Sequence, residues 1–226
     1  MSPRLNIVTV KYGTAYPADY VNRMFSMLRR HLDEDFDAWC ITEDPRGLEA
    51  SIKPIKPLFN VPGWWNKLFL FSPAMPEGEI LYLDLDQIIT GDISPLLAAC
   101  RKSGAKLCAY RDPLQWQGSA INSSWLYFRH PDLAFIYDAF VKDLPGVLTL
   151  EGGDQLYIWR HMKDVYFVDD VLPNGIKSFK FQLCKITGQT LNVPLDIDPA
   201  VRVINFHGRP KPHELMQVPW VQQHWH

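Results

Sequence analysis

Two acidic residues stand two positions apart at the end of an apolar run. Residues 80–83 are rich in β-forming types, and Asp84 and Asp86 follow almost at once. Alternate residues of an extended chain point to the same side, so both carboxylates are expected to face one way. Two negative charges held this close repel each other, and a divalent cation would keep both ionised. The pair therefore predicts a metal site, whereas a strand end with two solvated acids is the simpler interpretation of an Asp-x-Asp motif alone.

The composition describes a globular chain with no dominant charge. Its 226 residues are 47% hydrophobic and 13% aromatic, enough to bury the core of one large domain. A formal net charge of −2 argues against nucleic acid or an anionic membrane as the main partner. Residues 1–6 have no secretory apolar core, and no apolar run approaches the roughly 18 residues of a membrane-spanning helix. The four cysteines lack C-x-x-C spacing, so we expect reduced thiols and a cytoplasmic location.

Alternating strands and helices must position the two carboxylates. Apolar runs predict strands at 5–10, 38–42, 79–86, 106–110, 125–128 and 200–206. Periodicity and start signals predict helices at about 17–32, 94–102, 132–143 and 154–162. This alternation is typical of a three-layer α/β domain, which binds its ligands beyond the carboxyl ends of the strands. We expect four residues near predicted strand ends to converge on one cleft: Gly13, Asp84, Asp86 and His207.

Further motifs accompany the acidic pair in a fixed order. They are Lys67-Leu68, Gly91-Asp92-Ile93-Ser94-Pro95-Leu96, Ile121-Asn122-Ser123-Ser124, Gly152-Gly153-Asp154-Gln155 and Asn205-Phe206-His207-Gly208-Arg209-Pro210-Lys211-Pro212. With the Asp-x-Asp motif, they resemble the landmarks of GT-A-fold glycosyltransferases of the family-8 type, which include glycogenin and bacterial lipopolysaccharide galactosyltransferases. The resemblance implies a single three-layer GT-A domain with a mostly parallel, Rossmann-like sheet. Its nucleotide-binding part is expected over about 1–112 and its sugar and acceptor part over about 113–226.

The resemblance also implies a reaction and its reagents. It predicts a hexosyltransferase that moves a hexose from a nucleotide-sugar, usually a UDP-sugar, to a saccharide or glycoconjugate acceptor, with retention of anomeric configuration. Mn²⁺ or Mg²⁺ would bridge Asp84, Asp86 and the diphosphate. A metal and a cation both stabilise charge that develops on a diphosphate leaving group. Lys67 and Lys211 are the cations expected there, although outside these motifs each is simply a surface or loop lysine.

One position departs from the family pattern. The family's third metal ligand is the histidine that opens the His-Phe-x-Gly segment, and alignment on Gly208 and Lys211 places Asn205 there. His207 stands two residues later, on the same face of an extended chain. We predict His207 as the third ligand and Asn205 as the fallback, with water and phosphate oxygens as the remaining possibility.

Other roles are carried over from the motifs. The resemblance predicts nucleotide-binding residues at Thr9, Val10, Lys11, Tyr16, Lys67, Leu85, Gly208 and Lys211, with Tyr12 as a rival to Tyr16 for stacking on the base. It predicts catalytic residues at Asn122, Asp154, Gln155 and Lys211. Retention by front-face attack needs no strong base, whereas an inverting reaction would use Asp154 as its general base. Apart from the motif, Asp154 is equally suited to cap a helix N-terminus.

Two other functions stay open at this level. A nucleotidyltransferase that makes nucleotide-sugars normally has a glycine-rich phosphate loop after its first strand, and residues 10–13 are poor in glycine. A non-catalytic nucleotide- or carbohydrate-binding module is left open by Asn205. Trp116 is the expected acceptor contact. Trp64 and Trp65 are expected to pack in the core, with a sugar platform as the alternative. Ser124, where the family has glycine, is expected to narrow the sugar pocket.

Overall fold

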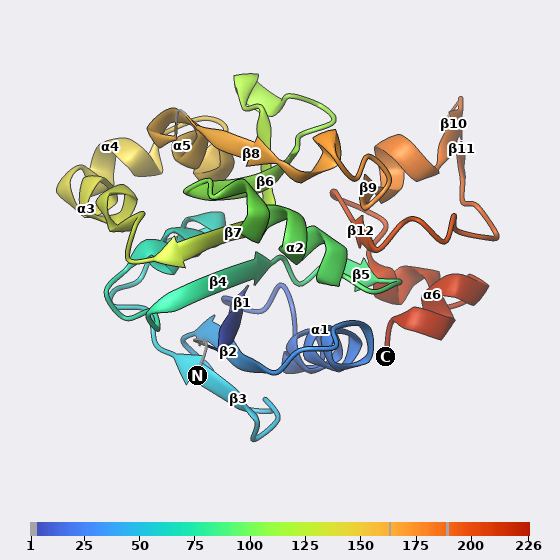
Figure 1. Cartoon of the computed structure of the whole chain (residues 1–226), viewed down its shortest axis with the longest axis horizontal. Helices are drawn as coiled ribbons and strands as arrows, with labels where there is room; N and C mark the ends of the chain where they lie inside the picture. The colour runs from blue at the N-terminus through green and yellow to red at the C-terminus, as the bar shows by residue number, and fades with distance from the viewer. Residues whose placement is uncertain (1–3, 163, 189) are drawn as a thin grey trace.

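A seven-stranded sheet forms the middle layer of the molecule (Figure 1). The computed structural model describes residues 4–162, 164–188 and 190–226, so the prediction for residues 1–6 lies partly outside it. β7 runs antiparallel to β4 and β6, and the other neighbouring pairs are parallel, which confirms the predicted mostly parallel sheet. The strand order is β3 (Ile52–Ile55), β2 (Phe36–Thr42), β1 (Leu5–Lys11), β4 (Gly78–Leu83), β7 (Ile121–His130), β6 (Leu107–Arg111) and β8 (Val165–Phe167).

Helices cover both faces of this sheet because successive strand residues point to opposite sides. On β1, Ile7 packs in one hydrophobic cluster with residues of α1 and α2, while Val8 packs in a second cluster with residues of α3, α5 and a 3₁₀ helix. Figure 1 shows α3, α4 and α5 together, away from α1. The predicted three layers are therefore confirmed. The helical segments are α1 (Ala18–His31), the 3₁₀ helix (Gly63–Phe71), α2 (Ser94–Ser103), α3 (Ala134–Lys142), α4 (Leu144–Leu148) and α5 (Gly153–His161).

The late part of the chain differs from its prediction. The strand expected at 200–206 is the short β12, which belongs to a separate sheet where it pairs with β5 and β9. Two further short strands, at 185–187 and 190–192, pair antiparallel with each other, and the sequence did not predict them. The elements of this region are β5 (Gln87–Ile89), β9 (Ile176–Ser178), a π-helical turn (Phe179–Leu183), β10 (Lys185–Thr187), β11 (Thr190–Asn192), β12 (Val203–Asn205) and α6 (Pro219–His224), with 3₁₀ turns at Trp116–Gly118, Val168–Asp170 and Pro212–Leu215.

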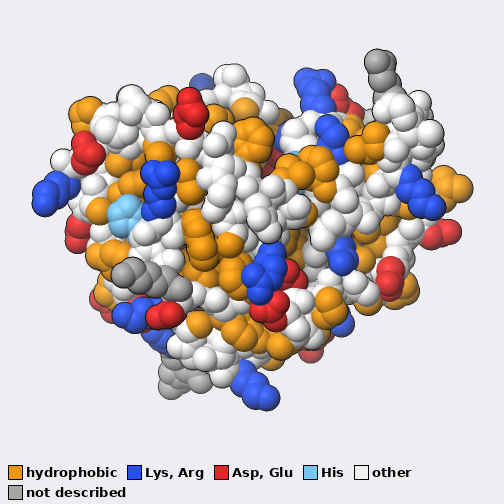
Figure 2. Space-filling view, turned by 90° about the horizontal axis from the view of Figure 1, so that it is seen from above, with side chains coloured by type: hydrophobic (Ala, Val, Ile, Leu, Met, Phe, Trp, Pro, Cys, Tyr) orange, Lys and Arg blue, Asp and Glu red, His pale blue; other side chains and the backbone are white. Residues whose placement is uncertain are grey.

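The surface carries charges of both signs. Figure 2 shows acidic and basic side chains interspersed over the face it views, in keeping with the net charge of −2. Across residues 4–162, 164–188 and 190–226, no helix combines the length and the hydrophobicity that a membrane crossing requires. All four cysteines are free thiols, and three of them are buried.

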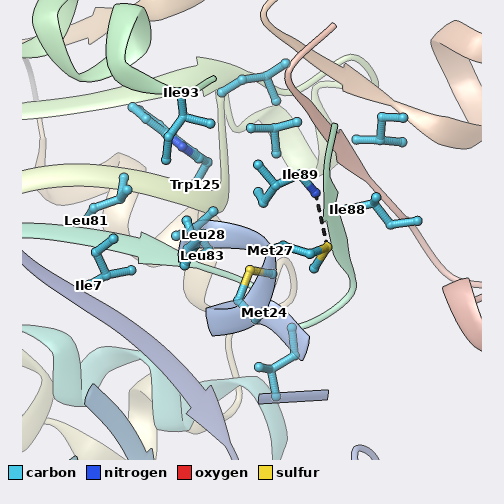
Figure 3. Close-up of a cluster of buried hydrophobic side chains, with 14 of the residues drawn as sticks. Ile7, Met24, Met27, Leu28, Leu81, Leu83, Ile88, Ile89, Ile93 and Trp125 are labelled. Atoms are coloured by element: carbon cyan, nitrogen blue, oxygen red, sulfur yellow. Dashed lines mark hydrogen bonds between the residues drawn. The ribbon is translucent and has the colours of Figure 1, made fainter. Parts of the chain in front are cut away.

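A hydrophobic cluster supports the segment that joins β4 to β5. Leu83 at the end of β4 and Ile88 and Ile89 on β5 are fully buried, and they pack near Met24 and Met27 of α1 (Figure 3). The Ile89 N–H donates to Met27 Sδ at 3.5 Å. Burial of such side chains contributes about 1.5–3 kcal/mol each. The short segment between them, which contains Asp84 and Asp86, is therefore anchored at both ends.

Candidate functional site

The two predicted carboxylates lie in the link from β4 to β5, because the strand expected over 79–86 ends at Leu83. The Asp84 N–H donates to the Ser124 carbonyl at 2.8 Å, and the Asp86 carbonyl accepts from the Phe206 N–H at 3.1 Å. Both side chains line one cleft of about 1030 Å³. The strand end is therefore tied to β7 on one side and to the end of β12 on the other. The intervening Leu85 is buried and lines a smaller pocket of about 190 Å³, which also contains Asp84 and Asp86.

Lys67 holds two carboxylates together from a buried position. Its Nζ lies 3.1 Å from Asp84 Oδ1, 3.1 Å from Asp154 Oδ2 and 3.0 Å from Ser123 Oγ. A lysine ammonium has three N–H donors, so these contacts use all of them. Burial alone would lower the pKa of Lys67, but the charges of Asp154 and Asp84 outweigh it and the net pKa is raised. Lys67 is therefore a charged crosslink between β4, β7 and α5.

Asp86 has a second set of partners. Its Oδ2 accepts from Tyr16 Oη at 3.0 Å and forms an ion pair with Lys211 Nζ. Burial and the neighbouring charge of Asp84 raise the pKa of Asp86, against the opposing effect of Lys211. Burial and Asp86 also raise the pKa of Tyr16, so its hydroxyl stays protonated and donates. The residues after β12 thus bring Lys211 to the predicted metal site, as the motif order required.

Asp154 and Gln155 lie in the first turn of α5. Gly152 occupies the N-cap, so the alternative that Asp154 caps this helix is wrong. The Asp154 carboxylate instead accepts from Ser123 Oγ at 2.8 Å and pairs with Lys67. Gln155 Oε1 accepts from the Ser123 N–H at 3.2 Å. Both residues line the large cleft together with Asn122.

A buried acid that the sequence analysis missed organises this wall. Asp112 Oδ2 accepts from Gln155 Nε2 at 3.2 Å and from the Trp116 N–H at 2.6 Å, and Oδ1 accepts from Asn122 Nδ2 at 3.4 Å. Asp112 is 5% exposed. It directly follows β6, which is the same strand-end signal that singled out Asp84. Tyr82 was also missed, although it points to the same side as Asp84 and donates to Asp84 Oδ1.

The predicted third metal ligands lie at the end of β12 and just beyond it, where Asn205 is opposite Gln87 in the ladder with β5. Asn205 is buried, and its Nδ2 donates to Ser124 Oγ at 2.6 Å and contacts Asn122 Oδ1 and His207 Nε2 at 3.3 Å each. Both Asn205 and His207 line the cleft. Burial lowers the pKa of His207, which favours the neutral imidazole that metals bind. Within the described ranges, however, no three His, Cys, Asp or Glu side chains gather closely enough to form a metal site by themselves.

The predicted nucleotide residues divide between pocket wall and sheet. Val10, Tyr16 and Leu85 line the smaller pocket, as does the rival Tyr12. Thr9 is fully buried within β1, and the Lys11 ammonium donates to the Asp44 carbonyl at 3.2 Å. Gly208 lines the large cleft. Lys67, Asp84, Asp86 and Trp64 line both pockets, so the two cavities meet at the carboxylates.

Comparisons with known proteins agree with this arrangement at the level of the fold. No protein-family model matches the chain, and no curated protein is similar to it in sequence. Solved structures do match. The galactosyltransferase LgtC, in complex with donor and acceptor sugar analogues, has a TM-score of 0.66 at 14% identity, over 97% of this chain and 93% of its own. The chain has the GT-A fold.

Two longer glycosyltransferases share the GT-A fold as well. GlyE of Streptococcus pneumoniae TIGR4 matches at a TM-score of 0.55 and 19% identity, over 74% of this chain and 45% of its own. The bifunctional glycosyltransferase WbbM matches at 0.60 and 10% identity, over 97% of this chain and 51% of its own. The chain thus spans about half the length of GlyE and WbbM. The GT-A fold implied by the motifs is confirmed.

Proposed function

We propose that this chain is a metal-dependent glycosyltransferase that moves a hexose from a UDP-sugar to a saccharide or glycoconjugate acceptor, with retention of anomeric configuration. One observation carries the proposal. Residues from five of the six sequence motifs line one cleft on a GT-A fold, and only the Gly91–Leu96 segment contributes no lining residue. The similarity to LgtC, which is described with donor and acceptor sugar analogues, supports a sugar donor and a sugar acceptor.

The donor set suits a hard divalent cation held at two points. Asp84 and Asp86 offer carboxylate oxygens in the same cleft, which is the chemistry that Mg²⁺ and Mn²⁺ favour. Mg²⁺ is commonly bound by one or two carboxylates, with substrate phosphates and water as its other ligands. His207 is the proposed third protein ligand. When bound, the cation neutralises charge on the departing diphosphate.

The lysines have separate tasks in this proposal. Lys211 contacts Asp86 from the loop after β12, and its side chain is 20% exposed, which supports the proposal that it meets the diphosphate. Lys67 was predicted to contact the diphosphate directly. Because Asp84, Asp154 and Ser123 use all three of its hydrogens, we propose that it chiefly fixes the two carboxylates in position.

Asp154, Asn122 and Gln155 are proposed to orient the sugar and the attacking hydroxyl. In the transfer, the acceptor oxygen bonds to the anomeric carbon, the bond from that carbon to the diphosphate breaks, and the acceptor proton passes to a departing phosphate oxygen. No protein base is needed for this route. The Asp154 carboxylate is already engaged by Lys67 and by the Ser123 hydroxyl, which supports an orienting role for it.

The smaller pocket is proposed to receive the nucleotide base. Val10, Tyr16 and Leu85 line it beside the carboxylates. Thr9 and Lys11 would contribute through the backbone of β1 and the turn that follows. The free thiols support the proposed reducing, cytoplasmic location.

Calorimetric titration with UDP, GDP and CMP tests the proposal, each with Mn²⁺ and then with a chelator. We expect UDP to bind only with the metal, because the diphosphate completes the cation's ligands. A panel of UDP-hexoses would then identify the donor. Binding of a nucleoside triphosphate with release of pyrophosphate would instead indicate a nucleotidyltransferase. If no nucleotide binds, the chain is better described as a non-catalytic module.

A further inference from the structure

Two indole rings lie half-exposed on the wall of the large cleft. Trp64 and Trp116 are each 56% exposed, and both line the cleft that contains Asp154. Leu114 and Phe181 are also exposed and line the same cavity. Single exposed hydrophobic side chains are common on proteins, but several that share one cleft indicate a binding surface.

The backbone around Trp116 is built to hold the ring in the open. Gln115 and Gln117, on either side of it, have φ angles of 48° and 52°. The left-handed region is unfavourable for a residue with a Cβ, and such strain is concentrated at functional sites. The Trp116 N–H donates to Asp112, and its carbonyl accepts from the Ser119 N–H at 3.0 Å. The loop is thus tied to the same buried acid that orients the wall of the cleft.

Trp64 is positioned by a different element, which packs against α5. It belongs to the 3₁₀ helix Gly63–Phe71, whose next residue, Trp65, is buried as predicted. The prediction that Trp64 also packs in the core is wrong, because its indole lies over the first turn of α5. A Cβ added to Gly153 would lie 2.6 Å from Trp64 Nε1. The ring borders both the large cleft and the smaller pocket, so it stands between the two proposed substrates.

The polar groups of the cleft favour a ligand without charge. Lys67 is already paired with Asp84 and Asp154, and Lys211 with Asp86. The other charged residues among those lining the cleft, Glu151 and Lys180, have opposite signs. The side-chain amides of Asn122 and Gln155 and the hydroxyl of Thr149 supply neutral hydrogen-bonding groups. Apolar rings beside neutral polar groups match a molecule with one C–H face and a rim of hydroxyls.

We infer that Trp116 and Trp64 form a platform that binds the ring of a neutral pyranoside acceptor by its C–H face. The inference rests on the proposed glycosyl transfer for its purpose, since it directs an acceptor hydroxyl toward the wall that contains Asp154. Stacking on an indole is tolerant of the sugar's hydroxyl pattern. The amides of Asn122 and Gln155 would therefore distinguish one pyranoside from another.

Binding of simple probes to the full chain tests the platform without any transfer. Methyl glucoside and methyl galactoside are titrated by saturation-transfer NMR in the presence of UDP and the diamagnetic Mg²⁺, beside methyl glucuronoside, glycerol and hexanol. We expect the neutral pyranosides to bind best, because only they combine a C–H face with uncharged hydroxyls. Loss of one stacking contact should weaken them about threefold to tenfold in Trp116→Ala. Trp116→Phe should stay within about threefold of the parent.

A matched control variant tests whether the loss of binding is specific to the cleft. Phe135→Ala removes an exposed aromatic ring from α3, outside the cleft, and should leave pyranoside binding as it is. Absent pyranoside binding at millimolar concentration overturns the platform, and so does equal binding by Trp116→Ala or a preference for hexanol or glucuronoside. Nucleotide titration of the same samples distinguishes failure of the platform from failure of the proposed function. Failure of UDP to bind would count against the proposed function, and pyranoside binding would still be measured.

Discussion

Lys67 is a buried cation whose hydrogens are all engaged by protein groups. Its side chain is 10% exposed, and that of Asp154 is 9% exposed. Removal of one partner from a buried ion pair leaves the other charge without compensation, which is costlier than loss of the pair as a whole. The lysine therefore contributes to the stability of the fold as well as to the geometry of the site.

We predict that Lys67→Met lowers the free energy of unfolding by about 3–5 kcal/mol, because Asp154 is left as an uncompensated buried acid and the partly buried Asp84 loses the same partner. Urea unfolding measures the loss. The double variant Lys67→Met with Asp154→Asn should recover part of it. Lys53→Met is the matched control, since Lys53 pairs with Asp37 at the surface and should cost less than about 1 kcal/mol. Equal losses in the two lysine variants would contradict a buried crosslink.

Asp86 gives a cleaner test of the metal than Asp84, because its partners Tyr16 and Lys211 lie outside the Lys67 network. Asp86→Ala should abolish the Mn²⁺-dependent part of UDP binding while the circular dichroism of the fold is retained. The physical reason is loss of one of only two carboxylates in the link from β4 to β5. Asp170→Ala, at an exposed pair with Arg111, serves as control. Unchanged UDP affinity with Mn²⁺ in Asp86→Ala would remove the metal assignment.

At the scale of single elements, the start of α5 is shaped by a close approach. Gly153 has a φ angle of 62°, and Trp64 leaves no room there for a Cβ. Gly104, at the end of α2, has a similar φ angle of 64° with nothing within 4 Å of an added Cβ. The two glycines therefore share a backbone requirement and differ in their surroundings.

We predict that Gly153→Ala destabilises the protein more than Gly104→Ala. The backbone cost of about 1–2 kcal/mol is common to both, and the displacement of Trp64 is added only at Gly153. Urea unfolding of the two variants gives the difference directly. A shift in the accessibility of Trp64 to a fluorescence quencher should accompany Gly153→Ala alone. Matching stability losses would show that Trp64 moves aside at no cost.

The elements were predictable where one local signal decides. Apolar runs located β1, β2 and β6 within a few residues, and the Asp-x-Asp motif located the site. β3 was missed because Pro54 interrupts a strand of only four residues at the sheet edge, where a missing N–H is tolerated. Asn122 and Ser124 were not expected inside a strand, because polar residues there are stabilised by contacts within the site.

The rest of the site depends on contacts between distant residues. Asp112 and Gln155 are 43 positions apart, and Asn205 and Asn122 are 83 apart. No periodicity or local motif records which of these polar groups will meet. Trp64 and Trp65 show the same limit of local sequence signals. They are adjacent and identical in type, yet Trp64 lies on the cleft wall and Trp65 lies in the core. Only the packing of the 3₁₀ helix against α5 decides between them.

At the scale of the whole molecule, residues 224–226 are hydrogen-bonded to α1. Arg30 donates to the carbonyls of His224 and His226 at 2.6 Å each, and Arg23 donates to the Trp225 carbonyl at 2.9 Å. The His31 and His224 rings lie 5.8 Å apart. Burial and the charge of Arg30 lower the pKa of His31 against the effect of Asp92, and burial with His31, Arg30 and His226 lowers that of His224.

This histidine pair predicts a pH dependence. A pKa below the unfolded value of about 6.5 means that the unfolded chain binds more protons, so the stabilisation is complete above that pH and is lost as the pH falls through the lower folded values. Both rings are partly exposed, so the loss in the free energy of unfolding should be about a few tenths of a kcal/mol. Thermal unfolding between pH 7 and pH 5 measures it. His224→Gln should reduce the acid sensitivity, whereas His161→Gln on α5 should not.

The pairing of β5 has a consequence for synthesis. β5 directly follows Asp86, yet in the described chain its ladder partner is β12, which begins more than a hundred residues later. At translation rates of about 5–20 residues per second, Ile88 and Ile89 emerge from the ribosome on the order of ten seconds before their partner strand. During that interval the carboxylate segment has only its β4 side in place. Chaperone binding to the nascent chain should therefore concentrate on this stretch and end when residues 203–205 appear.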